Sequence, residues 1–316
     1  MSSINTNTSA MNALSTLRNV NSTLNQTQDR ISTGLKVSSG KDNAAYFAIS
    51  ETMKGDSGMT KAVNESLTLT KNSVATARLG AEQFSDLANE FRDKVAFAQE
   101  NKGGLDEIEA DLTRLVADMS AIMEQSTFNG DDLVNAGGIG ADGINAAGGD
   151  SSFDAAGVYT AETNASAVAA NREVITGISR TSGGTLKTTK ITVEPVDLNQ
   201  QREMFRAIAD GFATKAATAA TGDDFLAAVL TAADTATQAT VDAATSLGQS
   251  EKSIERQQEF LTKLTDNLDT GVGAMVDANM EEEAARLQAL QVQQQLASQS
   301  LSIANQAPQN ILSLFR

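Results

Sequence analysis

The side chains best suited to chemistry are carboxylates, which cluster at residues 131–132, 223–224 and 281–283. Closely spaced carboxylates can bind Ca²⁺, but these clusters lack the spaced Asp/Asn ligands, central Gly and final Glu of a calcium loop. We interpret the two Asp pairs, each preceded by a glycine, as turns or helix caps. The three Glu follow Asn279, so we place them in the first turn of a helix that Asn279 caps, where the helix dipole favours negative charge. The prediction is structural carboxylates and no metal site.

Other reactive residue types are missing from the sequence. The chain has no Cys, no His and no Trp, which excludes thiolate and imidazole chemistry and Cys/His metal cages. Tyr46 and Phe47 could form a binding platform, but a single aromatic pair beside small residues fits a packed turn better. The glycine-rich run at residues 137–143 neither follows a clear strand nor opens a periodic helix, as a phosphate loop would. We expect no catalytic residues, no cofactor and no enzyme activity.

The net charge excludes further classes of partner. The 316 residues include 24 Lys and Arg against 40 Asp and Glu, a formal charge of −16, which disfavours nucleic acid as a partner. The longest apolar runs are too short for a membrane span, so we expect no membrane insertion. The N-terminus also lacks the basic and apolar blocks of a cleaved secretory signal.

The charge is unevenly distributed along the chain. Residues 1–40 carry a net charge of +2 and residues 287–316 a net charge of +1, which leaves −19 for the residues between them. Residues 287–315 contain no charged side chain, yet Gln, Ser and Asn interrupt the apolar residues too often for lipid. Uncharged polar groups are desolvated more cheaply than charged ones. This segment is therefore either disordered or buried against other protein.

Hydrophobic periodicity predicts the helices in the body of the chain. Steps of four and three residues, a heptad pattern, connect Val63, Leu67, Thr70, Val74, Ala77, Ala81, Phe84, Ala88, Phe91, Val95 and Ala98. After a break at residues 101–104 the pattern resumes through Leu105, Ile108, Leu112, Leu115, Met119 and Ile122. A third series comprises Leu226, Leu230, Ala233, Thr237, Thr240, Ala244, Leu247, Glu251, Ile254, Gln258, Leu261, Thr265, Leu268, Val272 and Met275. The pattern predicts long helices that pack antiparallel.

The two ends of the chain follow the same rule more weakly. One series comprises Leu14, Leu17, Asn21, Leu24, Gln28, Ile31 and Leu35, and the other comprises Met280, Glu283, Leu287, Leu290, Gln294, Ala297, Leu301 and Ala304. Polar members of such a series specify register and lower stability. A helix over most of the first 35 residues would be about 50 Å long and unstable without a partner.

We therefore predict that the two ends lie side by side and that neighbouring copies of the chain complete them. The expected self-assembly residues are Leu14, Leu17, Leu24, Ile31, Leu35, Leu287, Leu290, Leu301, Ile311, Leu312, Leu314 and Phe315.

The middle of the chain, residues 131–221, differs from both flanks. Many glycines interrupt its first half, and residues 187–198 alternate β-branched and polar side chains like an exposed strand that ends near Pro195. A short helix is expected over residues 199–217. The segment is thus predicted to be a small mixed lobe inserted into a helical stem.

The predicted fold class is mainly α, with long antiparallel heptad-patterned helices, the N- and C-termini side by side, and a small α+β lobe mid-chain. Residues 1–40 and 280–316 form a terminal helical domain in this prediction. Residues 41–130 and 222–279 form a core helical bundle, and residues 131–221 form a variable, surface-exposed insertion.

Four stretches resemble bacterial flagellins, in the order that flagellins have them. They are ISTGLKVSSGKDNAAYFAISETM (residues 31–53), STFNGDDLV (126–134), LGQSEKSIERQQEFLTKLTDNL (247–268) and ANQAPQNILSLFR (304–316). The likeness covers roughly residues 1–135 and 225–316 and leaves the insertion unmatched. The turn AMVDANMEEE, residues 274–283, is similar to the alphaproteobacterial type.

The resemblance implies a structural subunit of the extracellular flagellar filament that serves swimming motility. It implies export, unfolded, through the flagellar export apparatus, and polymerisation beneath a cap protein. In the family the paired terminal helices form the inner tubes of the filament. An export chaperone is expected on residues 280–316, with the filament cap and hook-associated junction proteins as further partners.

Two other interpretations remain open at this point. The hook–filament junction protein of the flagellum shares the terminal architecture, although its ends match less closely. A soluble acidic coiled-coil adaptor would explain the heptads and the charge, but not the loss of charge at both ends.

Overall fold

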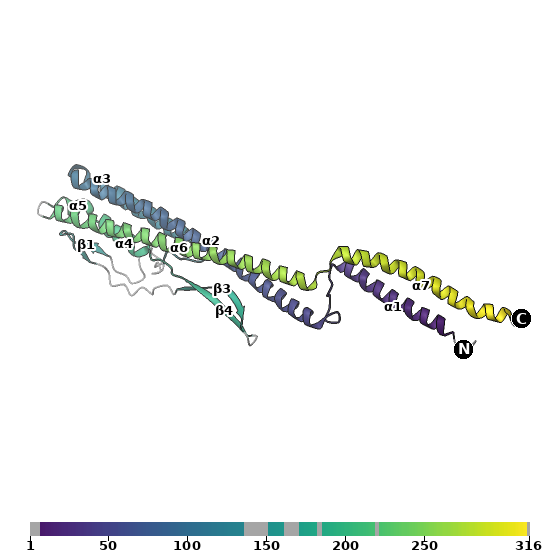
Figure 1. The fold of residues 1–316 in the computed structure, drawn as a ribbon. Helices are drawn as coiled ribbons and strands as arrows, with labels where there is room; N and C mark the ends of the chain where they lie inside the picture. The colour runs from purple at the N-terminus through teal and green to yellow at the C-terminus, as the bar shows by residue number, and fades with distance from the viewer. Residues whose placement is uncertain (1–6, 136–150, 161–170, 182–184, 219–220, 315–316) are drawn as a thin grey trace. The chain divides into compact units, whose positions relative to one another are not determined.

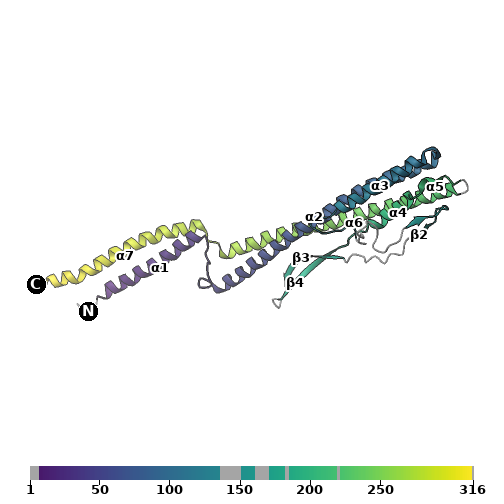
Figure 2. The ribbon, with the colours of Figure 1, turned by 180° about the vertical axis from the view of Figure 1, so that it is seen from behind.

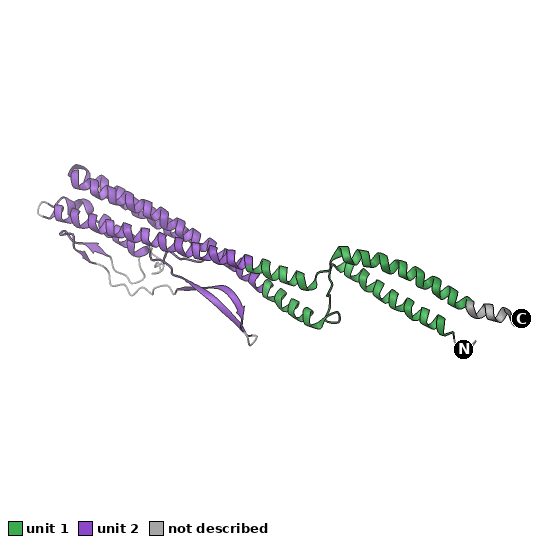
Figure 3. Ribbon diagram, viewed as in Figure 1, with its two compact units in different colours: residues 1–58, 264–316 green, residues 59–263 purple. Residues whose placement is uncertain are grey.

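The computed structural model describes residues 7–135, 151–160, 171–181, 185–218 and 221–314, and Figure 1 labels its helices and strands. The chain divides into two compact units (Figure 3): unit 1 comprises residues 1–58 and 264–316, and unit 2 comprises residues 59–263. The division falls inside two long helices, α2 (Ala44–Glu100) and α6 (Gly222–Val276). Heptad packing that continues along both helices leaves no break in the chain at that point.

Unit 1 is built around an antiparallel pair of helices, α1 (Thr8–Thr33) and α7 (Met280–Leu314). The side chain of Asn7 caps α1 by accepting a hydrogen bond from the amide of Ala10 at 3.0 Å. Gly34 ends α1 in the left-handed conformation, with a φ of 73° that other residues rarely adopt. The predicted pairing of the two ends of the chain is therefore present within one molecule.

In unit 1, the connection between α1 and α2 lies against the connection between α6 and α7. The amide of Lys36 donates to the carbonyl of Val276 at 2.6 Å, and the amide of Ala278 donates to the carbonyl of Gly34 at 2.9 Å. A small apolar cluster supports them and contains Val37, Val272 and Val276, with Leu35, Phe47, Met53 and Met275 packed around it. Phe47 thus packs beside a turn, as predicted, whereas Tyr46 is half exposed.

Unit 2 is a bundle in which α2 packs antiparallel to α3 (Leu105–Gln125) and to α6. Every member of the predicted series from Val63 to Ala98 is buried. The members of the third series that fall in unit 2 are all buried or half-buried as well. The break predicted at residues 101–104 is a short 3-10 helix, η1 (Lys102–Gly104). The heptad prediction for the bundle is confirmed.

Aromatic residues attach the helices of the predicted insertion to this bundle. The ring of Phe205, in α4 (Asn199–Ala209), lies 4.8 Å from that of Phe91 and 6.2 Å from that of Phe84. Gly211, at a φ of 62°, separates α4 from α5 (Phe212–Ala216), so the one helix expected here is two. Because Phe205 and Phe212 are fully buried, α4 and α5 belong to the core of unit 2.

The described strands of unit 2 form two hairpins. The longer one pairs β3 (Arg172–Arg180) with β4 (Leu186–Val193), and the shorter one pairs β1 (Ser152–Phe153) with β2 (Tyr159–Thr160). Both are antiparallel, and the β3–β4 register shifts between Ile175 and Gly177. The predicted strand at residues 187–198 corresponds to β4, which ends before Pro195. β3 was not predicted, although its own alternation of Val174, Thr176 and Ile178 was visible in the sequence.

Two structural details of these units lead to predictions. At Gly80 of α2, an added Cβ would lie 1.8 Å from Ser126 Oγ and 2.5 Å from Ser126 Cβ. At Gly55 of the same helix, an added Cβ would meet nothing within 4 Å.

Gly80→Ala is expected to lower the free energy of unfolding by about 1–3 kcal/mol, because the methyl group overpacks the contact with α3. Gly55→Ala, the control, should raise helix stability by about 0.5–1 kcal/mol, because alanine is the better helix former and has room there. Urea unfolding followed by circular dichroism measures both variants. Equal effects of the two substitutions would contradict the close α2–α3 contact.

The turn before α2 is organised by one carboxylate. Asp42 accepts hydrogen bonds from the hydroxyls and backbone amides of Ser38 and Ser39, each at 3.1 Å. The Ser39 hydroxyl, followed by the Ser38 hydroxyl, lowers the pKa of Asp42 below its ordinary value of 3.8. Because the pKa of Asp42 is lower in the folded state, the charged carboxylate stabilises the turn at pH values above its ordinary pKa. This stabilisation is lost as the pH falls through the pKa of the folded state.

The amide chemical shifts of Ser38 and Ser39 should therefore titrate with a midpoint below 3.8, the ordinary pKa of an aspartate. Nuclear magnetic resonance spectra recorded through an acid titration measure this midpoint. In Asp42→Asn the titration should disappear. A wild-type midpoint at or above the ordinary value would show that these hydrogen bonds do not favour the charged form.

Candidate self-assembly surface

One face of α7 is covered by α1. Its buried or half-buried positions follow steps of four and three residues: Glu283, Leu287, Leu290, Gln294, Ala297, Leu301 and Ala304. These positions, including Glu283, are the ones predicted from the sequence. The predicted first member, Met280, is instead half exposed. A regular heptad face of this kind fits a single partner helix along its whole length.

The face of α1 that contacts α7 matches the predicted series only in part. At some positions the covered residue is the one just before the predicted residue. The covered positions are Ala10, Ala13, Leu17, Val20, Leu24, Thr27 and Ile31, with Asn21 half-buried beside them. Leu14 is 37% exposed and Gln28 is exposed. Ala13, Val20 and Thr27 repeat every seven residues, just as Leu14, Asn21 and Gln28 do, so the period does not distinguish the two sets. Contact with α7 selects between them.

Three polar contacts fix the register of α1 against α7. Near one end of the pair, the side-chain amide of Asn7 donates to the carbonyl of Ala304 at 2.8 Å. Gln294 donates to the Asn21 side chain at 2.7 Å near the middle. Arg30 forms an ion pair with Glu283 at 3.2 Å near the other end. Because the three contacts are spread along the helices, a shift of one helix along the other would break all of them.

The opposite face of α7 carries a second apolar stripe. Val292, Leu296 and Ile303 are 55%, 59% and 69% exposed. Together with the exposed Ala285 and Ala289 they follow a second heptad series, two residues out of step with the first. Two residues correspond to a rotation of about 200° around a helix, so this stripe lies outside the face of α7 that α1 covers. The sequence analysis missed it, although the same steps of three and four would have found it.

A groove lies beside the second stripe. It has a volume of about 450 Å³ and is lined by Ala13, Thr16 and Val20 from α1 and by Gln293, Leu296, Ala297 and Ser300 from α7. All of these residues are uncharged. No described helix combines the length and apolarity that are needed to cross a bilayer.

The remaining predicted assembly residues occupy different environments. Leu24 and Leu290 are buried between α1 and α7, and Leu17, Ile31, Leu287 and Leu301 are half-buried there. Leu35 packs in the small cluster around Val276. Ile311, Leu312 and Leu314 lie in the last turns of α7, but their side chains, and Phe315 as a whole, fall outside the described residues.

The carboxylates singled out in the sequence have structural partners. Asp132 accepts from the amides of Val134 and Asn135, and Asp131 forms an ion pair with Arg172. Asn279 caps α7 by accepting from the amide of Glu281 at 3.1 Å, so the three glutamates lie in the first turn as predicted. Within the part of the chain that the structure describes, no group of three or more acidic residues is arranged to hold a metal ion.

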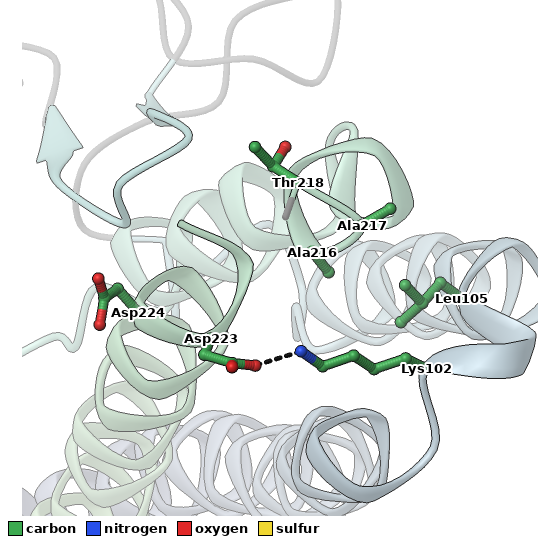
Figure 4. Close-up of a pocket in the computed structure, with 7 residues that line it drawn as sticks. All are labelled: Lys102, Leu105, Ala216, Ala217, Thr218, Asp223 and Asp224. Carbon is green, nitrogen blue, oxygen red and sulfur yellow. Dashed lines mark hydrogen bonds and ion pairs between the residues drawn. The ribbon is translucent and has the colours of Figure 1, made fainter. Parts of the chain in front are cut away.

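A polar pocket of about 510 Å³ lies at the end of unit 2 where η1 meets α5 and α6 (Figure 4). Lys102 faces it and forms an ion pair with Asp223, while Asp224 points away from that pair. Leu105 and Ala216 to Thr218 complete the lining. Within the described lining, the lysine of this pocket is already paired with a carboxylate.

The shifted pKa values in unit 2 arise from ion pairs, some between neighbouring helices and some within one helix. Lys71 lowers the pKa of Glu255 and has its own pKa raised by that contact. Lys94 lowers the pKa of Asp111 in the same way. Glu255 and Asp111 are exposed and Lys71 and Lys94 are half-buried, so these shifts indicate ion pairs at the surface of the bundle.

Comparison with known proteins decides the family. Residues 4–137 match the bacterial flagellin N-terminal helical region, and residues 230–315 match the bacterial flagellin C-terminal helical region. The chain is 34% identical to a flagellin of Brucella melitensis biotype 1 over 320 aligned residues, which cover 100% of both chains. The chain belongs to the bacterial flagellin family.

Further relatives agree with this assignment. Flagellin A of Rhizobium meliloti is 33% identical over 396 residues, and flagellin C of Rhizobium meliloti strain 1021 is 33% identical over 324 residues, with 100% of both chains covered in each case. The protein is therefore a flagellin, a structural subunit of the extracellular flagellar filament, rather than a junction protein or an adaptor. The family models match nearly the same two stretches as the resemblance seen in the sequence, and the relatives align over the whole chain.

The ion pair between Arg30 and Glu283, in the first turn of α7, should hold the two terminal helices of this flagellin together. The Glu283 side chain is 7% exposed and also lies 3.6 Å from Arg286, whereas Arg30 is 30% exposed. Glu283→Gln should destabilise the α1–α7 pair by about 1–2 kcal/mol, because two arginines lose their nearby carboxylate. Hydrogen exchange of the α1 and α7 amides measures this loss.

Glu281→Gln is the matched control, since Glu281 is exposed in the same helical turn. It should leave amide exchange in α1 unchanged. Equal exchange in both variants would mean that Glu283 does not hold α1.

Proposed function

We propose that this flagellin polymerises through α1 and α7, which present a second, uncovered helix face to neighbouring copies. The observation that carries the proposal is the stripe of Val292, Leu296 and Ile303 on the side of α7 that α1 does not cover. Residues 287–315 contain no charged side chain that would have to be desolvated when a neighbour covers that face. The single chain therefore leaves α7 half packed.

Burial of the second stripe would favour polymerisation by several kcal/mol in total. Covering the remaining exposed surface of each of its three large side chains is worth about 1–2 kcal/mol. In a helical assembly each subunit makes this contact and also receives it, so the gain repeats along the polymer. The groove beside Leu296 gives a neighbouring helix a place to insert side chains.

The predicted assembly residues divide into two roles in this proposal. Leu17, Leu24, Ile31, Leu287, Leu290 and Leu301 hold α1 and α7 together, because they are buried or half-buried between these helices. Leu14, which is partly exposed on α1, extends the outward surface. Leu35 supports the adjacent connection, and Ile311, Leu312, Leu314 and Phe315 are proposed to continue the contact at the C-terminal end.

The proposal extends to the domain roles that the family resemblance suggests. Residues 1–40 and 280–316 would form the inner part of the filament, and residues 41–130 and 222–279 the surrounding layer. Residues 131–221 would face solvent apart from α4 and α5, which pack into the core of unit 2. The acidic charge between residues 41 and 286 supports this arrangement, because charged side chains favour the outer, hydrated part of an assembly.

Partners other than the protein itself are proposed on the same surface. An export chaperone bound to residues 280–316 would cover the second stripe and so prevent early polymerisation. The filament cap and the hook-associated junction proteins would meet the same terminal helices at the two ends of the polymer. Export would take the unfolded chain through the flagellar apparatus, for which the marginal stability expected of isolated terminal helices is suited.

Leu296→Asp should abolish growth of filaments from preformed seeds, because it places a charge in the centre of the second stripe. Sedimentation and electron microscopy measure the growth. Helical circular dichroism of the monomer should stay close to that of the wild type, since Leu296 is 59% exposed in the single chain.

Val241→Asp is the control, an apolar-to-charged change at an exposed position of α6 outside the terminal helices. It should leave growth within about twofold of the wild type. Normal filaments from Leu296→Asp would overturn the proposal, as would filaments from a chain lacking residues 1–40 and 280–316. Failure of the wild type itself to polymerise would do the same.

A further inference from the structure

The apolar cluster beside the two connections of unit 1 contains two methionines. Its buried members are Val37, Val272 and Val276, and Met53 and Met275 pack against them, each half-buried. The connection between α1 and α2 and the connection between α6 and α7 run side by side in both views (Figures 1 and 2). The cluster therefore supports the place where α1 and α6 end and where α2 and α7 begin.

Methionine carries all of the sulfur in this chain. The sequence has nine Met and no Cys, so an oxidant that attacks sulfur reacts with methionine. Susceptibility to such oxidants follows exposure. Met11 and Met280 are 65% and 46% exposed, whereas Met119 and Met123 are 0% and 1% exposed in the core of unit 2. The two methionines of the cluster lie between these extremes, so a small oxidant reaches them more readily than the core pair.

Met53 packs closely against the backbone of α6. A Cβ added at Gly271 would lie 2.9 Å from Met53 Cε, closer than side-chain carbon atoms normally approach. The methyl group of Met53 therefore occupies the space that a side chain at position 271 would need. The sulfur is bonded directly to this methyl group, so an oxygen added to the sulfur must find room beside a tight contact. A well-packed site accommodates extra atoms only by shifts of side chains or backbone.

The amides beside the cluster already have hydrogen-bond acceptors. The amides of Lys36 and Val37 both donate to the carbonyl of Val276, at 2.6 Å and 3.3 Å, and the amide of Ala278 donates to the carbonyl of Gly34 at 2.9 Å. A sulfoxide oxygen in the cluster either competes for these donors or stays unpaired. Both outcomes weaken the connections, because a buried polar group without a partner is costly and a displaced carbonyl loses its hydrogen bond.

We propose that Met53 and Met275 form an oxidation site for hydrogen peroxide and related two-electron oxidants, and that oxidation there loosens the two connections. In the reaction the methionine sulfur attacks one oxygen of the peroxide, an S–O bond forms and the O–O bond breaks. The proton of the transferred oxygen moves to the departing hydroxide, which leaves as water. Sulfur loses two electrons and the peroxide gains them. The inference concerns the single chain and does not depend on the proposed polymerisation.

Peptide mass spectrometry of the full-length monomer after timed exposure to hydrogen peroxide tests the site. Met53 and Met275 should be oxidised at least about tenfold faster than Met119 and Met123, because the core pair is fully buried. Equal rates for the two pairs would overturn the proposal.

Hydrogen exchange at two reporter amides tests the consequence. After oxidation of the wild type, the amides of Lys36 and Ala278 should exchange at least about fivefold faster than before treatment. The double variant Met53→Leu, Met275→Leu keeps most of the apolar volume but lacks the reactive sulfur. The same treatment should leave its reporter amides unchanged.

The matched control is the double variant Met11→Leu, Met280→Leu, which removes two exposed methionines outside the cluster. Its reporter amides should still exchange faster after treatment. Reporter amides that stay slow in the oxidised wild type would overturn the proposal, and so would equal acceleration in the variant that lacks both cluster methionines.

Enzymatic reduction of the oxidised wild type gives a second measurement that does not depend on how leucine packs. Methionine sulfoxide reductases, one for each sulfoxide epimer, return the side chains to methionine, and mass spectrometry verifies the reduction. Exchange at Lys36 and Ala278 should then return to the rate of untreated protein. Exchange that stays fast after complete reduction would show that the loosening has another cause and would overturn the proposal.

Discussion

The central constraint on this structure is that α7 carries two apolar stripes, each of which is suited to burial against other protein. α1 covers one heptad stripe, and the second stripe, with Val292, Leu296 and Ile303, remains exposed in the single chain. A soluble monomer usually places charged residues on such a face, but residues 287–315 have none. The terminal helices are therefore complete only in contact with further protein. This requirement explains why a protein with 40 acidic residues has no charged side chain at residues 287–315.

The polar contacts between α1 and α7 give this apolar pairing a defined register. Leucine and alanine faces alone tolerate sliding, since one heptad resembles the next. The Gln294–Asn21 hydrogen bond and the Arg30–Glu283 ion pair have partners at one alignment of the helices. A fixed alignment in each subunit keeps the outward stripe in the same place in every copy, which a regular polymer needs.

Unit 2 shows a different balance between packing and exposure. Its heptad seams are filled by buried side chains from three helices, and Phe205 connects α4 to the same core. The bundle thus completes its own core, in contrast to the terminal pair.

The amino-acid sequence alone determined the long helices, their antiparallel partners and the family, because heptad spacing is a local pattern that α-helix geometry turns directly into a buried face. The positions from Val63 to Ala98 and those from Glu283 to Ala304 were readable for this reason. Tertiary structure decided whether Ala13 or Leu14 faces α7, since both fit a period of seven. It also decided that α4 and α5 enter the core, and that one α7 stripe stays uncovered, because these outcomes depend on which surfaces meet across distant parts of the chain.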